Sequence, residues 1–245
     1  MIVLPIEKTK AKVENPRFLI IFGKPKMGKT TIVAALEDNL IIDLEGGSQF
    51  MDALSIQART VEELGEIANA IREKIKQTGK KPYKYITIDS GTVLEEIVKP
   101  FALKLYQSTP MGKKYNDDIL KLPNGAGYMY VREAFEKVRT MFMNLTDNFI
   151  LVCHCKDTMI NKEGKEMSEM SVDLSGKLAR ITMAAADAIG YLYRDKKQTI
   201  LNFNGGGDFI CEARAPHLRG KEIVIAESDE NNVVHVDWTK VFLPE

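Results

Sequence analysis

The chain has 245 residues, enough for one large domain or for one domain with an appendage. Hydrophobic residues make up 44% of the sequence, so the chain can bury a substantial core. Lysine and arginine together number 34, as do aspartate and glutamate, and this balance excludes a global positive field that would attract nucleic acid. Any site for a polyanion must therefore be a local patch.

The first two thirds of the chain alternate apolar segments with helical ones. Thr60-Val-Glu-Glu63 is a capping-box signature that opens an amphipathic helix, and Gly79 and Pro82 end it. Strands are expected at 17–22, 40–43 and 83–89, and helices at 31–36, 60–77 and 92–106.

The second half begins with a polar segment, 107–127, which is predicted to be a long functional loop. A helix is then expected at 128–146, a strand at 148–154, a mobile hairpin at 155–173 and a helix at 174–186. Three closely spaced strands follow, at 188–193, 199–203 and 208–213. This order predicts an α/β fold whose mainly parallel sheet is flanked by helices and extended by antiparallel strands at the C-terminal end.

The sequence indicates an intracellular protein. Its three cysteines form no paired framework, which favours a reducing compartment. Cys153-His154-Cys155 could suggest a metal site, but a buried strand is the preferred interpretation because no second ligand pair exists elsewhere. No segment has the form of a signal peptide or the length of a membrane span, so we expect a cytoplasmic protein without a membrane partner.

Residues 23–30 read Gly-Lys-Pro-Lys-Met-Gly-Lys-Thr, a full match to the phosphate-binding pattern G-x-x-x-x-G-K-[ST] between a strand and a helix. The glycines allow a tight turn whose N–H groups point at one anion, and the new helix adds its partial positive charge. Lys29 is expected to reach the β- and γ-phosphates, and Thr30 to bind Mg²⁺. The predicted nucleotide-binding residues are Gly23, Lys24, Pro25, Lys26, Met27, Gly28, Lys29, Thr30 and Thr31.

Three polar residues end the following strands. Asp89 has the form of a Walker B carboxylate that holds Mg²⁺ through water, although it could instead cap the next helix. Glu45 is placed to polarise the attacking water, or else is a solvated turn residue before Gly46 and Gly47. His154 is either a sensor of the γ-phosphate or a core histidine. No Asn-Lys-x-Asp motif is present, which argues against a GTPase.

Together the P-loop, Glu45, Asp89 and His154 resemble the RecA-like ATPases, and most of all the short phage-encoded RecA-like proteins, some of which anneal single strands. The resemblance covers about residues 17–215, and it departs at His154, where the recombinases usually have glutamine. It implies domains at 1–16 (N-terminal extension), 17–226 (RecA-like ATPase domain) and 227–245 (C-terminal strand or tail). It also implies ATP and Mg²⁺ as cofactors and, for a phage protein, the host cytoplasm.

The resemblance further implies partners. It predicts a homo-oligomeric ring or filament in which Arg214 completes the neighbour's site, with Arg194, Lys196 and Lys197 as fallback candidates and a surface cation as the alternative. It places single-stranded DNA at 107–127 and 155–173, with a single-strand-binding protein as a further partner; the second segment could equally be a solvated loop. The candidate DNA-binding residues are Lys113, Lys114, Tyr115, Lys156, Lys162 and Lys165.

The function expected from the sequence is a magnesium-dependent ATPase that acts on single-stranded DNA in phage-type recombination or annealing, with Lys29, Glu45, His154 and Arg214 as its catalytic residues. Two other classes stay open. One is a P-loop kinase or motor with a substrate other than DNA. The other is a non-catalytic assembly protein gated by nucleotide.

Overall fold

The computed structural model describes residues 4, 6–7, 13–162, 165–206 and 209–244. Its centre is a mixed sheet whose strands run in the order β11-β10-β8-β7-β1-β5-β4-β2-β3. The strands of the parallel part are β1 (Phe18–Gly23), β2 (Asn39–Asp43), β3 (Ser55–Gln57), β4 (Tyr85–Asp89), β5 (Asn148–Lys162) and β7 (Ala188–Asp195).

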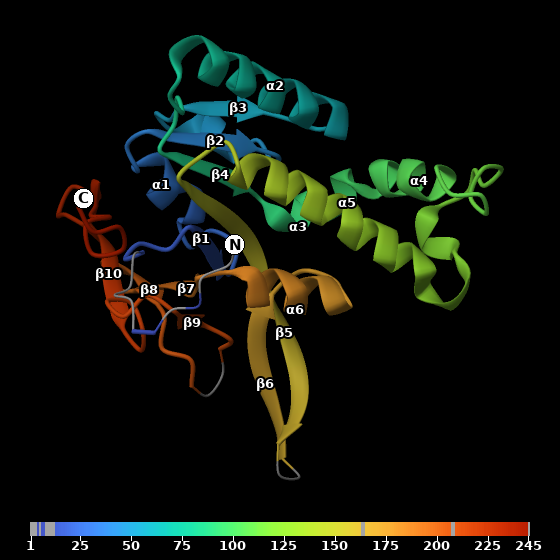
Figure 1. Cartoon of the computed structure of the whole chain (residues 1–245). Coiled ribbons are helices and arrows are strands. Elements are labelled where there is room, and N and C mark those ends of the chain that lie inside the picture. The colour runs from blue at the N-terminus through green and yellow to red at the C-terminus, as the bar shows by residue number, and fades with distance from the viewer. Residues whose placement is uncertain (1–3, 5, 8–12, 163–164, 207–208, 245) are drawn as a thin grey trace.

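Antiparallel strands extend the sheet beyond β7. A further antiparallel strand pairs with the far half of β5 to form a hairpin, called the arm below. The former are β8 (Gln198–Asn202), β9 (Glu212–Ala213), β10 (Glu222–Ser228) and β11 (Val234–Val236). The arm forms because β5 continues past the sheet and pairs with β6 (Lys165–Val172), and Figure 1 shows this hairpin projecting away from the body. The predicted α/β fold class, mainly parallel with antiparallel strands toward the C-terminal end, is confirmed.

Side chains of the buried strands alternate between the two faces of the sheet and form two separate cores. More helices cover one face than the other. One face carries α2 (Val61–Thr78), α3 (Gly91–Ile97), α4 (Lys99–Gln107), α5 (Ala126–Met143) and α6 (Gly176–Ala185). The other carries α1 (Lys29–Ala34) and the C-terminal segment, which contributes Trp238, Val241 and Phe242.

Most predicted elements are confirmed, including the capping box, in which Thr60 and Glu63 each bond the other's backbone N–H. The helix expected at 92–106 is instead two helices, α3 and α4, which meet at Val98 just before Pro100. The 107–127 segment contains short 3₁₀ turns at Ile119–Lys121 and Pro123–Gly125. The short edge strand β3 and strand β10 were not predicted, and β11 lies within 227–245, where a strand or tail was expected.

The C-terminal segment packs on the same core as the P-loop helix. β10 runs through residue 226, where the sequence places a domain boundary, and pairs with β8 on both sides of it. Beyond it, the indole Nε1 of Trp238 donates a 2.8 Å hydrogen bond to the carbonyl oxygen of Ile32 in α1. Among the residues described, no helix has the length and apolar character needed to cross a membrane.

Candidate nucleotide-binding site

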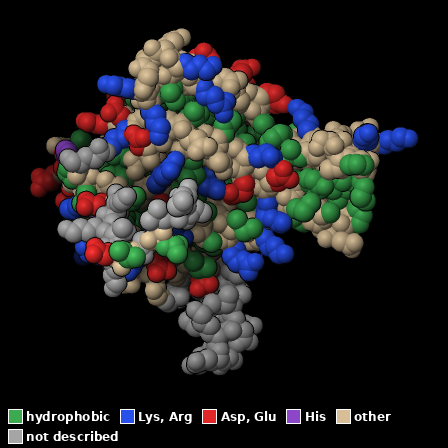
Figure 2. Space-filling model, in the orientation of Figure 1, with side chains coloured by type: hydrophobic (Ala, Val, Ile, Leu, Met, Phe, Trp, Pro, Cys, Tyr) green, Lys and Arg blue, Asp and Glu red, His purple; other side chains and the backbone are tan. Residues whose placement is uncertain are grey.

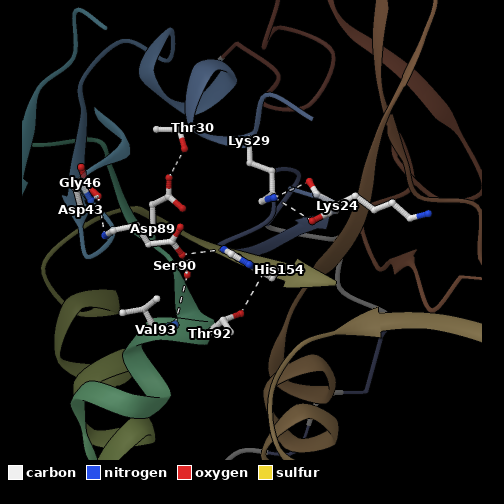
Figure 3. A network of polar contacts seen from close by, with 12 residues as sticks. Lys24, Lys29, Thr30, Asp43, Gly46, Asp89, Ser90, Thr92, Val93 and His154 are labelled. Atoms are coloured by element: carbon white, nitrogen blue, oxygen red, sulfur yellow. Dashed lines mark hydrogen bonds and ion pairs between the residues drawn. The ribbon is translucent and has the colours of Figure 1, made fainter. Parts of the chain in front are cut away.

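The P-loop, Glu45, Asp89 and His154 meet at one edge of the sheet, where the parallel strands β1, β2, β4 and β5 end. The register sets Asp43 beside Asp89 and Gly23 beside His154. Because the carboxyl ends of parallel strands share one edge, residues 131 positions apart become neighbours. The sheet therefore brings the P-loop, Glu45, Asp89 and His154 together. Figure 3 shows Lys29, Thr30, Asp89 and His154 around the same strand ends.

The two glycines of the P-loop are required for different physical reasons. A Cβ atom on Gly23 would lie 2.5 Å from the carbonyl oxygen of Leu192, so a side chain there would force β1 away from β7. Gly28 has φ +93°, a left-handed conformation that other residues rarely adopt. Lys24, Pro25 and Lys26 are exposed, whereas Met27, Gly28 and Thr31 are partly buried.

Lys29 folds back into the loop that precedes it. Its buried ammonium donates hydrogen bonds to the carbonyl oxygens of Gly23 (2.9 Å) and Lys24 (3.0 Å). Burial lowers the pKa of Lys29, and the charges of Asp89 and Glu45 oppose that shift. The cation is thus held at the mouth of the P-loop, within reach of an anion bound by the loop.

Thr30 and Asp89 form the part of the site that fits a magnesium ion. The Thr30 hydroxyl donates a 2.6 Å hydrogen bond to Oδ2 of Asp89 (Figure 3). Burial raises the pKa of Asp89 to about 6, against the lowering effect of this hydrogen bond. Hydroxyl and carboxylate oxygens are ligands that Mg²⁺ prefers, with nucleotide phosphates and water completing its shell. The described residues include no cluster of three or more acidic, histidine or cysteine ligands.

Glu45 is positioned by a turn that Asp43 holds together. Asp43 accepts hydrogen bonds from the backbone N–H groups of Glu45 (3.0 Å), Gly46 (2.7 Å) and Ser48 (2.9 Å), and from the Ser48 hydroxyl (2.6 Å). Burial alone would raise the pKa of Asp43, but these hydrogen bonds lower it below the ordinary value. The end of β2 is therefore a fixed platform for the carboxylate of Glu45.

The carboxylate of Glu45 is gripped by two residues from neighbouring strands. Its Oε1 atom accepts a hydrogen bond from the Ser90 hydroxyl and lies 2.9 Å from Nε2 of His154. Figure 3 shows the His154 ring aimed from β5 toward the end of β4. His154 is 34% exposed at its side chain, so it belongs to the site and not to the core.

Three positioning residues were missed by sequence reasoning: Asp43, Ser90 and Thr92. Ser90, not Asp89, caps α3, where its hydroxyl accepts from the N–H of Val93. Thr92 accepts a 3.1 Å hydrogen bond from the N–H of His154. The run Asp43-Leu-Glu-Gly-Gly-Ser48 contained the signal for the turn, since an aspartate before glycines often binds backbone N–H groups. No local sequence pattern predicted the contact between Ser90 and Glu45, which are 45 residues apart.

Arg214 lies at the opposite edge of the sheet. It follows β9, whose Ala213 pairs with the first residue of β7, and its guanidinium binds Asp187 (3.3 Å) and the carbonyl oxygen of Ala184 (2.8 Å). Asp187 also accepts from the N–H groups of Arg17 and Phe18, at the amino end of β1. Arg214 is therefore remote from the P-loop of its own chain, and its role in a neighbour's site stays a prediction.

The candidate DNA-binding residues are not gathered into one patch. Lys113 and Lys114 are exposed, but Tyr115 packs edge-on against Tyr106, 5.4 Å between ring centroids, and donates a hydrogen bond to the carbonyl oxygen of Asp118. Lys156 bonds the carbonyl oxygen of Leu174 at the base of the hairpin. Lys162 and Lys165 pair in register near the end of the arm, and their side chains lie outside the described residues.

The fold and the site are those of a P-loop nucleotide-binding domain. A comparison with protein families matches residues 15–231 to the family described as AAA domain, and the chain belongs to that family. None of the curated proteins matches it significantly. Among solved structures, a KaiC-like protein from the hyperthermophilic archaeon Pyrococcus horikoshii OT3 is similar, with 15% identity, a TM-score of 0.45, and coverage of 90% of this chain and 89% of that one.

Proposed function

We propose that the protein is a magnesium-dependent ATPase that acts on single-stranded DNA, in recombination or strand annealing of the phage type. One observation carries the ATPase part. The P-loop, the Thr30–Asp89 pair and the restrained carboxylate of Glu45 converge at one sheet edge. Adenine as the base is supported by the resemblance to RecA-like ATPases.

The residues of the chain divide the work of hydrolysis. The P-loop backbone and Lys29 bind the phosphates, and Thr30 and Asp89 would hold Mg²⁺, which supplies charge to offset that of the phosphates. Glu45 orients the attacking water and accepts its proton. Because His154 touches Glu45 directly and begins the arm, it connects the site to the hairpin of residues 155–173.

The ATPase proposal is tested by comparing Glu45→Gln with Lys29→Ala. Glutamine keeps an acceptor for Ser90 but cannot take a proton, so Glu45→Gln should bind ATP normally and lose about a hundredfold or more in turnover. Lys29→Ala should lose binding. If wild type and Glu45→Gln both bind ATP and neither hydrolyses it, the protein is a nucleotide-gated scaffold and the ATPase proposal is wrong. Transfer of phosphate to a molecule other than water would instead identify a kinase.

The DNA part of the proposal is supported by a cavity between α5 and α6, at the base of the two predicted loops. The cavity has a volume of about 640 Å³, and its lining includes Arg132, Lys177, Tyr128 and Met129. Figure 2 shows Lys and Arg side chains gathered over α6 and the adjoining part of α5. Tyr128 and Met129 are about half exposed, so an aromatic face and two cations are together available to a strand.

The DNA part is tested with the double variant Arg132→Gln, Lys177→Gln. Affinity for single-stranded DNA should fall about tenfold or more at low salt, and the dependence of affinity on salt should weaken, because two phosphate contacts are lost. The matched control is Lys74→Gln, Lys80→Gln, which removes the same charge from exposed positions at and just beyond the end of α2, where no DNA contact is proposed. Equal loss in both variants would assign binding to general charge, and no loss in either would remove DNA as the partner.

The oligomer part is supported only by the resemblance, through Arg214. In a ring or filament, specific activity should rise with protein concentration, and Arg214→Ala should lower it in the assembled state. Size-exclusion chromatography at the assay concentration would show whether assembly is kept. Wild-type turnover by assembled Arg214→Ala would show that Arg214 has no role in trans.

A further inference from the structure

Arg194 lies against the P-loop of its own chain. A Cβ atom placed on Gly28 would lie 3.3 Å from Nη2 of Arg194 and 4.0 Å from both Cζ and Nε. The guanidinium of Arg194 therefore lies against Gly28, the residue that directly precedes Lys29. Arg194 is exposed to solvent, so its guanidinium is accessible to an anion bound at the loop.

The fold explains why Arg194 reaches this place. β7 is the parallel neighbour of β1, and the close approach of Leu192 to Gly23 brings the ends of the two strands together. Side chains two residues apart on a strand share a face, so Arg194 lies on the same face as Leu192. Leu192 packs in the core that α1 covers, and Arg194 therefore points over the start of α1.

The position of β7 also decides which part of a nucleotide Arg194 would meet. Glu45, Asp89 and His154 come from β2, β4 and β5, which all lie on one side of β1. The γ-phosphate must sit on that side, because Glu45 orients the water that attacks it. The rest of the phosphate chain then runs toward the other side of β1, where β7 and Arg194 lie.

We infer that Arg194 is a nucleotide-binding residue that acts in cis on the α- and β-phosphates. This inference rests on the proposed nucleotide site and assigns to Arg194 a role other than completing a neighbour's site. Arg194 contacts a part that ATP and ADP share, so it holds both equally and does not discriminate between them. A planar guanidinium suits this role because it can donate two parallel hydrogen bonds to phosphate oxygens.

The test is equilibrium binding of ADP and of a non-hydrolysable ATP analogue, with Mg²⁺, at a protein concentration where the chain is monomeric. Arg194→Ala should weaken both ligands by the same factor, about tenfold or more. Arg194→Lys should recover part of the affinity, since it restores the charge without the fork.

Lys196→Gln is the matched control, because it removes one positive charge two residues further on, in the turn that follows β7. It should bind both ligands as wild type does. Loss confined to the ATP analogue would place Arg194 at the γ-phosphate, and unchanged binding with lower turnover in the assembled state would place it in a neighbour's site; either result overturns the inference. If wild type itself fails to bind either nucleotide, or Lys29→Ala binds as well as wild type, the nucleotide site is wrong as a whole.

Discussion

Asp89 is proposed to bind Mg²⁺ as an ionised carboxylate, but its burial favours the protonated form. With the folded pKa raised from 3.8 to about 6, the unfolded chain ionises first as pH rises, so apoprotein stability falls across that window and stays lower above it. Asparagine does not titrate. Asp89→Asn should therefore stabilise the apoprotein at about pH 8, by about 3 kcal/mol at most, and have little such effect at about pH 4.

This prediction is measured by urea unfolding in chelator at the two pH values. The same variant should lose magnesium-dependent turnover. Asp43→Asn is the control of opposite sign. Because hydrogen bonds lower the pKa of Asp43, its ionised form contributes stability above the ordinary pKa, and that contribution is lost as pH falls through the folded value. Asp43→Asn should thus destabilise at about pH 8. Destabilisation by both variants would contradict the assignment for Asp89.

Ser90 is predicted to affect turnover only through its hydrogen bond to Glu45, apart from its structural role as the N-cap of α3. Ser90→Ala removes one of the two groups that hold Oε1 of Glu45, so the carboxylate gains freedom and productive orientation of water becomes rarer. Turnover should fall about tenfold while ATP affinity stays unchanged. Ser90→Thr keeps the hydroxyl and should recover much of the rate.

Measuring kcat and the dissociation constant separately decides the point. If Ser90 served only as the cap of α3, Ser90→Ala would lower the free energy of unfolding without a selective fall in kcat. Ser90→Thr would then restore stability, with no separate recovery of kcat. That result would contradict the prediction.

At the residue scale, the predictable part of the site was the part whose chemistry is local. The sequence of residues 23–30 by itself predicts a phosphate-binding loop, and Asp89 could be picked out because it ends an apolar run. Ser90 and Thr92 could not be assigned, because their partners, Glu45 and His154, lie 45 and 62 residues away. Arg194 could be named as a candidate cation but not placed, since only the pairing of β7 with β1 brings it to Gly28.

Helix α3 links the nucleotide site to the cavity proposed for DNA. Ser90 at its start bonds Glu45, and Thr92 in its first turn bonds the backbone of His154. One turn further, Glu95 accepts hydrogen bonds from the N–H and the hydroxyl of Ser175, which lines the cavity. A rigid helix held at both places can carry a displacement of Glu45 to α6.

Glu95→Gln should therefore reduce the stimulation of turnover by single-stranded DNA while leaving basal turnover near wild type. Glutamine retains one acceptor oxygen but loses the charge that strengthens both bonds from Ser175. The measurement is turnover with and without DNA at one fixed salt concentration, because phosphate contacts depend on salt. Glu96→Gln, which changes the exposed neighbour, is the control. Full stimulation in Glu95→Gln would exclude α3 as the connection.

At the scale of elements, strongly patterned segments were predictable and short ones were not. Both ends of the amphipathic helix that begins after Thr60 were predicted correctly, because the residues that cap it are adjacent to it in the sequence. The division of 92–106 at Val98 was missed, although Pro100 was a warning. β3 covers three residues that are all exposed, and its identity as a strand depends on the edge of β2 that it joins.

At the scale of the whole molecule, the C-terminal segment packs against the P-loop helix. α1 has only six residues, so its last carbonyl groups find no partners within the helix. Asn39 bonds the carbonyl oxygen of Val33 (2.7 Å), and Trp238 bonds that of Ile32 (2.8 Å). Such closure between segments 206 residues apart could not be deduced from the sequence, because the contact exists only once β10 and β11 have joined the sheet.

Trp238→Phe should therefore destabilise the whole domain, by about 1–3 kcal/mol, because it leaves the buried carbonyl of Ile32 without its donor while keeping an aromatic ring beside Phe242. Urea unfolding gives the free energy, and Val233→Ala, at an exposed position of the same segment, should be neutral. Since α1 carries Lys29 and Thr30, saturating Mg²⁺ and ATP analogue should restore part of the loss by mass action. If Trp238→Phe unfolds like wild type, the C-terminal segment is an appendage that the P-loop helix does not need.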